Sequence, residues 1–174
     1  YQIECRLMRF IGQNSVNLKQ ILIGGVVLVF GALVYLIARH PESTYFVQQS
    51  NINLGLYNAV PDFFGPIHRS LPAFSHVFAF ILLTSGFTTC GKMGSLIVCL
   101  SWFLIDLAFE LGQKFYAWVP IVIPEWFEGI PILENTRDYF ILGTFDIFDV
   151  AAIAVGALSA YVVTWHTMER RQPG

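Results

Sequence analysis

The stretch Ser101-Trp-Phe-Leu-Ile-Asp-Leu-Ala-Phe-Glu-Leu-Gly-Gln113 places two carboxylates and an amide inside an otherwise apolar run. In a helix, Asp106, Glu110 and Gln113 follow one another at i, i+4 and i+7, so they share one face. Carboxylates are costly to place against lipid, so this face must turn toward protein or water. We therefore expect the helix to pack its polar face against the rest of the chain.

The composition indicates a membrane protein. The chain has 174 residues, of which 55% are hydrophobic and 13% are charged, and its mean hydropathy is +0.60. Soluble domains carry about 25% charged residues. The length suits one domain covering residues 1–174. The net charge of −2 favours neither nucleic acid nor anionic lipid as a partner. Cys5, Cys90 and Cys99 have no metal-ligand spacing, and we expect free thiols, no metal and no cofactor.

Four apolar runs are long enough to cross the ~30 Å hydrocarbon core of a bilayer. They cover about 18–38, 71–87, 93–113 and 145–166. The first run lacks the cleavage site of a secretory signal. Residues 1–13 are amphipathic and predict a short interfacial helix, with a frayed terminus as the alternative. The predicted fold is an all-α polytopic membrane protein with four transmembrane helices.

The segments around the last run carry further signals. Residues 114–144 contain three prolines that exclude a long helix, and their aromatic side chains suit the membrane interface. Asp146 is a candidate N-cap for the closing helix. Ala152, Gly156 and Ala160 are spaced four apart, which favours close helix packing in lipid. We expect this helix to be central, with the other three around it.

The distribution of cations predicts the orientation. With four spans, both termini lie on the same side of the membrane. That side has six cations: Arg6, Arg9, Lys19, Lys92, Arg170 and Arg171. The other side has four: Arg39, Arg69, Lys114 and Arg137. The positive-inside rule then places both termini in the cytoplasm.

This orientation brings the titratable residues of the last three helices to one level. They form a predicted polar layer near the outer leaflet, facing the periplasm or the cell exterior: His76, Asp106, Glu110, Gln113, Asp146 and Asp149. Intramembrane ionisable residues are functional candidates by default, and Asp106 lies deepest. We expect the polar layer to line an outward-facing pocket.

Three blocks of this sequence resemble the VanZ-like membrane protein family. They are Ser75-His-Val-Phe-Ala-Phe-Ile-Leu-Leu83, Phe109-Glu-Leu-Gly-Gln113 and Gly143-Thr-Phe-Asp-Ile-Phe-Asp149 followed by Gly156. The resemblance covers about residues 71–165. It implies a bacterial inner-membrane protein with a connection to glycopeptide-antibiotic resistance, since the type member lowers susceptibility to teicoplanin.

The chain departs from the family pattern at three positions. Ile153 replaces an Asn, Thr144 replaces a basic residue, and Ala160 replaces the last Gly. If the Asn and the basic residue serve ligand binding in the family, this chain has kept the scaffold without that activity.

Three functional readings follow. The first is a non-enzymatic, VanZ-like protein whose polar layer binds an envelope lipid or another amphiphile. The second is an accessory subunit of a larger membrane complex, in which helix faces and outer loops dock to partner subunits and the polar layer joins the helices. The third is an intramembrane enzyme that uses a metal or acid–base chemistry, for which His76, Glu110 and Asp149 supply one imidazole and two carboxylates.

Overall fold

Every element in the described part of the chain is helical. The computed structural model describes residues 16–38, 69–88, 91–130, 133 and 136–168. The predicted interfacial helix at residues 1–13 lies outside these ranges. The described residues form four long helices, and four short helical segments join the third of these to the fourth: α2 (Leu18–Ala38), α4 (Leu71–Thr88), α5 (Lys92–Lys114), η3 (Tyr116–Trp118), α6 (Val119–Val122), η4 (Glu125–Gly129), α7 (Thr136–Leu142) and α8 (Ile147–Thr167).

The four long helices lie where the apolar runs predict them. All four are long and apolar enough to cross a membrane. A helix of 21 residues, such as α2 or α8, extends about 31 Å, which matches the ~30 Å hydrocarbon core. Four such helices indicate a membrane-embedded protein. Between α5 and α8, the residues that the structure describes form only short helices, as the prolines of this segment predict.

The start of α8 lies two residues later than predicted because Asp146 caps the helix. Its backbone is extended, with φ −128° and ψ 124°, and its Oδ1 accepts a hydrogen bond of 2.9 Å from the backbone N–H of Phe148. This bond satisfies one of the backbone donors that lack a partner in the first turn of a helix. The prediction of Asp146 as the N-cap is confirmed.

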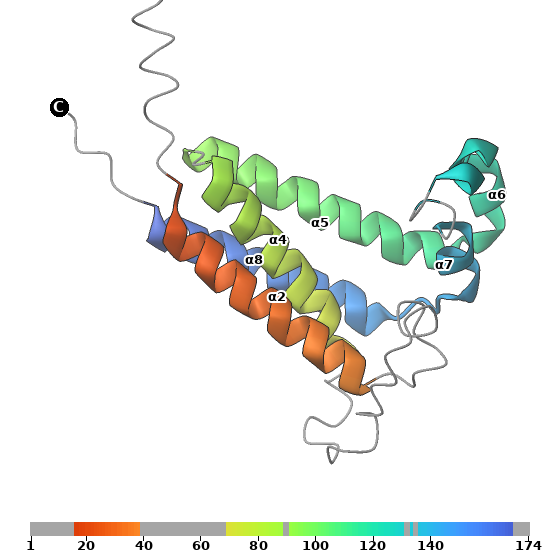
Figure 1. Cartoon of the computed structure of the whole chain (residues 1–174), viewed down its shortest axis with the longest axis horizontal. Coiled ribbons are helices and arrows are strands. Elements are labelled where there is room, and N and C mark those ends of the chain that lie inside the picture. The colour runs from red at the N-terminus through yellow and green to blue at the C-terminus, as the bar shows by residue number, and fades with distance from the viewer. Residues whose placement is uncertain (1–15, 39–68, 89–90, 131–132, 134–135, 169–174) are drawn as a thin grey trace, which may run out of the picture.

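The central helix is α4, and the prediction that the closing helix is central is wrong. Figure 1 shows α4 between α2 and α5, with α8 behind it, and α4 packs against all three. In the most apolar stretch of α4, 44% of the residues are buried, against 28% in α8. The small residues of α8 do allow close packing against α4, but α4 also packs against α2 on its other side.

Glycines set the close approach on both sides of α4. On α2, a Cβ at Gly24 would lie 3.0 Å from the carbonyl oxygen of Ala79, and one at Gly31 would overlap the Ser75 side chain. On α8, a Cβ at Gly156 would lie 2.6 Å from Cγ1 of Val77. Small residues let helix backbones approach closely where lipid supplies no hydrophobic driving force.

The apolar core lies where α4, α5 and α8 meet. Its buried members are Val77, Phe78, Ile81, Leu82, Cys99, Ile153, Ala157 and Ala160. Large apolar side chains on the outer face of α2 are exposed, among them Leu22, Val26 and Val29. An inward core with an equally apolar outer surface is what a bundle in lipid requires.

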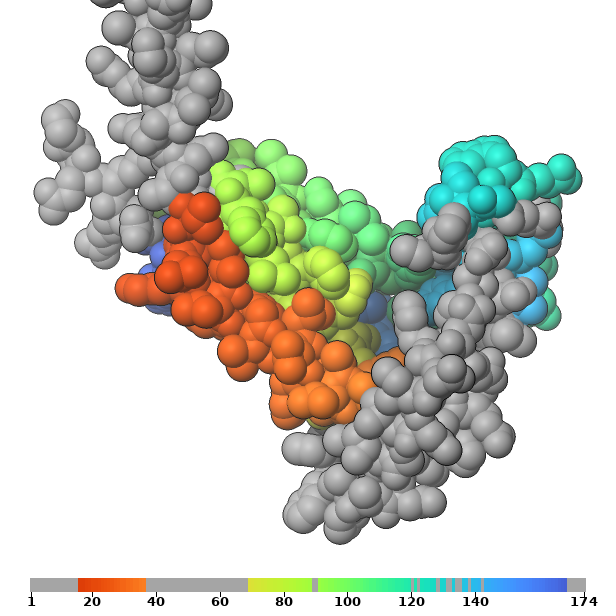
Figure 2. All heavy atoms as spheres, viewed as in Figure 1, coloured from red at the N-terminus to blue at the C-terminus, as the bar shows by residue number. Residues whose placement is uncertain are grey.

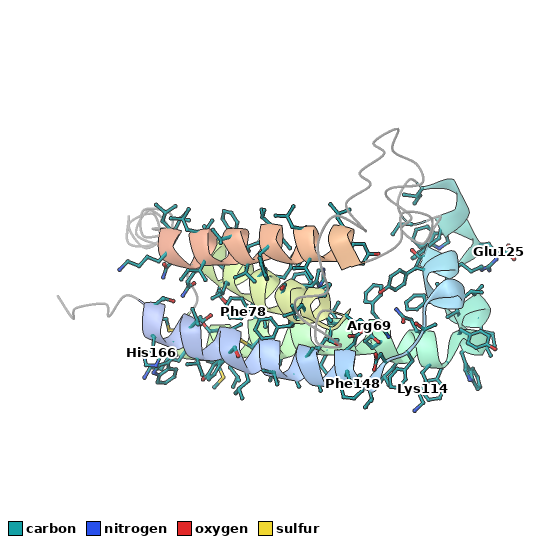
Figure 3. The ribbon with its side chains drawn as sticks, turned by 90° about the horizontal axis from the view of Figure 1, so that it is seen from below. Arg69, Phe78, Lys114, Glu125, Phe148 and His166 are labelled. Atoms are coloured by element: carbon teal, nitrogen blue, oxygen red, sulfur yellow. The ribbon has the colours of Figure 1, made fainter. Side chains whose placement is uncertain are left out.

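Two cation–π contacts join the ends of the antiparallel pair α5 and α8. Lys92 Nζ lies 4.1 Å from the ring centroid of Trp165 at one end, and Lys114 Nζ lies 4.9 Å from that of Phe145 at the other. Figure 3 shows Lys114, Phe148 and Arg69 at one end of the bundle and His166 at the opposite end. The N-terminal ends of α4 and α8 therefore lie beside the C-terminal end of α5.

Candidate functional site

Within the polar layer, a direct side-chain contact joins α4 to α5. His76 Nδ1 on α4 lies 3.1 Å from Asp106 Oδ2 on α5. The His76 side chain is 50% exposed, whereas that of Asp106 is 9% exposed. A buried carboxylate needs a partner, and the imidazole supplies one while half of the His76 side chain stays exposed.

Aromatic side chains surround this pair. The ring of Phe80 lies 4.4 Å from that of His76 and 4.7 Å from that of Trp102, between centroids. Trp102 Nε1 donates a hydrogen bond of 2.9 Å to Thr84 Oγ1. His76, Phe80 and Thr84 are spaced by four along α4, as are Trp102 and Asp106 on α5, so two helix faces match turn by turn.

Two further members of the polar layer follow Asp106 along α5. Glu110, one turn or about 6 Å further along the helix, is buried, and its Oε2 is inaccessible to solvent. Gln113 packs against Gly143, where a Cβ would lie 2.7 Å from Cδ of the glutamine. This contact brings the end of α5 against the segment that leads into α8.

The remaining two members lie at the start of α8. Asp146 is committed to the helix cap, so one of its oxygens is already occupied by the backbone. Asp149 is in the first turn, and its Oδ1 is buried. Carboxylates in this position interact favourably with the positive end of the helix dipole.

The structure therefore places all six residues toward the end of the bundle where α4 begins and α5 ends. It brings His76 to Asp106, and Gln113 to the residues before Asp146. Among the described residues, no group of three His, Cys, Asp or Glu side chains is arranged to hold a metal ion. Figure 1 shows α2 and α5 diverging toward this end.

A second polar cluster at the opposite end was missed by the sequence analysis. We name it the capping cluster: Asn17, Gln20, Thr164 and Thr167. Asn17 Nδ2 donates to the carbonyl of Thr167 at 2.9 Å, and Gln20 Nε2 donates to Thr167 Oγ1 at 3.0 Å and to the carbonyl of Thr164 at 3.4 Å. The backbone N–H of Asn17 donates to the carbonyl of Gly86 at 2.9 Å.

The capping cluster supplies donors to the carbonyls of Gly86 and Thr167, which lie in the last turns of α4 and α8, where helix carbonyls lack intrahelical partners. Residues at the start of α2 thus cap the C-terminal ends of both α4 and α8. The signal in the sequence was Gln20, a polar residue inside the first apolar run, which is only 2% exposed in the structure.

The structure also shows how deeply the small residues of α8 are buried, and likewise the positions that depart from the VanZ-like pattern. Gly156 and Ala160 are buried, and Ala152 is half-buried. Ile153 is 2% exposed and belongs to the apolar core, whereas Thr144 is exposed. The position where the family has Asn is therefore a packing position in this chain.

The described residues thus form a helical bundle with four helices long and apolar enough to cross a membrane and with polar side chains gathered near both ends. Comparison with protein-family models, with curated proteins and with solved structures finds no match to this chain.

Proposed function

We propose that the chain is a non-enzymatic, VanZ-like protein of a bacterial inner membrane, and that its polar layer binds the headgroup of an envelope lipid or another amphiphile. The observation that carries the proposal is the half-exposed imidazole of His76, held 3.1 Å from the buried carboxylate of Asp106. A pairing that served only to join helices would be expected to bury both partners.

The surroundings of the pair suit an amphiphilic ligand. Ligand sites combine a mostly apolar lining with a few polar groups that fix orientation. Here the rings of Phe80 and Trp102 supply the apolar part, and the imidazole and the carboxylate supply the polar part. Headgroup hydroxyl, amine and phosphate groups all exchange hydrogen bonds with imidazole.

The expected depth of the site in the membrane also supports a lipid headgroup as the ligand. If Lys114 lies at the membrane interface, then Glu110 lies about 6 Å and Asp106 about 12 Å deeper along α5. A ligand that reaches His76 would therefore extend from the headgroup zone into the upper part of the acyl chains.

The test is native mass spectrometry of the protein extracted in mild detergent, with the variant His76→Ala. We expect the wild-type protein to retain a lipid or amphiphile through delipidation, and His76→Ala to bind it at least about tenfold more weakly, which corresponds to about 1.4 kcal/mol. Asp106→Asn should give an intermediate loss because an amide oxygen still accepts from the imidazole.

The matched control is His166→Ala, which removes an exposed histidine at the opposite end of the bundle and should leave binding unchanged. Equal retention by wild type and His76→Ala, with unaltered thermal unfolding, would contradict the proposal. Loss of folding in His76→Ala and Asp106→Asn without any bound molecule in the wild type would make the pair a contact between helices.

The second candidate is an accessory subunit of a larger membrane complex. It is favoured by Ile153, which occupies the family's Asn position inside the core, and by the exposed apolar face of α2. In the same native experiment, partner proteins at constant stoichiometry would support this candidate in place of the first.

A further inference from the structure

The segment that follows α5 presents large apolar side chains away from the bundle. We call residues 115–127 the aromatic segment. Exposed fractions are 53% for Phe115, 63% for Trp118, 76% for Ile121 and 62% for Trp126. The segment comprises η3, α6 and the start of η4, and it contains two prolines. Large apolar side chains exposed together indicate a contact with a partner that is itself partly apolar.

The aromatic segment is attached to the bundle by a few buried contacts. Val119 is only 6% exposed and holds α6, which packs against α7. Next to it, α7 docks on α5 through stacked rings, with Phe140 5.5 Å from Phe109 between centroids. The Phe140 ring lies where a Cβ at Gly112 would be. The exposed side chains are therefore not those that hold the segment in place.

The direction of the aromatic segment is across the bundle axis. Figure 1 shows α6 projecting sideways from the end of α5. In Figure 2 its cyan surface stands apart from the green surface of α4 and α5. If the long helices cross the bilayer, a segment that leaves their end sideways runs parallel to the membrane plane.

Its level along the bundle matches the interfacial zone. The 23 residues of α5 extend about 34 Å, slightly more than the ~30 Å hydrocarbon core, so its end at Lys114 falls at the membrane interface. Tryptophan and tyrosine concentrate at this level because their rings are apolar and their N–H or O–H groups need a polar partner. If α5 crosses the bilayer, lipid faces its exposed side, and the aromatic segment begins where that side reaches the membrane interface.

We propose that the aromatic segment is an in-plane membrane anchor, with Trp118, Ile121 and Trp126 in contact with the headgroups and the upper acyl chains of the same leaflet that the polar layer faces. This inference goes beyond the proposed ligand site and does not depend on it. The anchor would fix the depth and tilt of α5, the helix that carries Asp106.

The test uses a nitroxide spin label at Ile121→Cys, in a background without Cys5, Cys90 and Cys99, reconstituted in phosphatidylcholine–phosphatidylglycerol vesicles. Collision rates with oxygen, which partitions into lipid, and with a water-soluble nickel chelate report depth. We expect a label at Ile121 to favour oxygen over nickel, but less than a label at Leu100→Cys, which lies on the exposed face near the middle of α5.

Either of two results would overturn the proposal. A label that collides with nickel as freely as in water would place the segment in solvent, and one shielded from both reagents would place it against protein. A second measurement uses tryptophan fluorescence in vesicles of brominated lipid. The difference in fluorescence between wild type and Trp118→Phe gives the contribution of Trp118. Bromines near the glycerol end of the chains should quench the Trp118 component more than bromines near the methyl end, and equal or absent quenching would count against the anchor.

Discussion

At the scale of the residue, the absence of a side chain controls how closely α2 and α4 approach. Gly31 faces Ser75 with no room for a Cβ, whereas Gly25, on the same helix, has nothing within 4 Å of the position its Cβ would take. The two glycines are alike in the sequence and differ only in what the neighbouring helix places beside them.

We predict that Gly31→Ala destabilises the fold by about 1–3 kcal/mol, the usual cost of overpacking a close contact. The change Gly25→Ala should be neutral or stabilising by up to about 1 kcal/mol, because alanine is the better helix former. Reversible unfolding in mixed micelles, followed by circular dichroism, measures both. Equal stability of the two variants would mean that α2 can move away from α4 without cost.

At the scale of the element, the start of α2 caps the ends of two other helices. The capping cluster joins residues about 150 positions apart, so it forms only when α2 and α8 are both in place. Gln20 is buried and uses its amide for two of these bonds.

We predict that Gln20→Leu lowers the free energy of unfolding by about 0.6 kcal/mol and by at most about 1.7 kcal/mol, the range measured for interhelical hydrogen bonds in membranes. The neighbouring change Lys19→Gln alters an exposed side chain and serves as the control. Thermal unfolding in detergent measures the stability of both variants relative to wild type. A loss in Lys19→Gln as large as that in Gln20→Leu would contradict the assignment of the stabilisation to the capping cluster.

At the scale of the whole molecule, the bundle has two chemically different ends. The polar layer and the aromatic segment lie at one end, and the capping cluster and the contact of Lys92 with Trp165 lie at the other. The excess of cations on the side of the termini favours placing that side in the cytoplasm.

We predict that a membrane-impermeant maleimide labels Glu125→Cys in intact spheroplasts and labels Lys92→Cys only after permeabilisation, in a background without native cysteines. Both positions are exposed on the protein surface, so a difference in labelling does not come from burial within the bundle. The reverse pattern would invert the proposed orientation and turn the polar layer toward the cytoplasm.

The sequence alone was enough to predict the four helices, because the length and continuity of an apolar run are local properties. It also predicted the cap at Asp146 and the spacing of Asp106 and Glu110 on one face of α5, both of which depend on neighbours along the chain. It predicted that polar residues of three helices gather at one end, because successive helices that each cross the bilayer return the chain to the same level.

The central position of α4 and the pairing of the polar groups became apparent only in the folded bundle. Small residues at helical spacing occur on both α2 and α8, and the sequence does not state which helix they face, so α4 was not recognised as their common partner. The pairing of His76 with Asp106 and the capping by Gln20 depend on the rotation of each helix about its axis. That rotation is set by packing between segments distant in the sequence, where no local pattern carries the information.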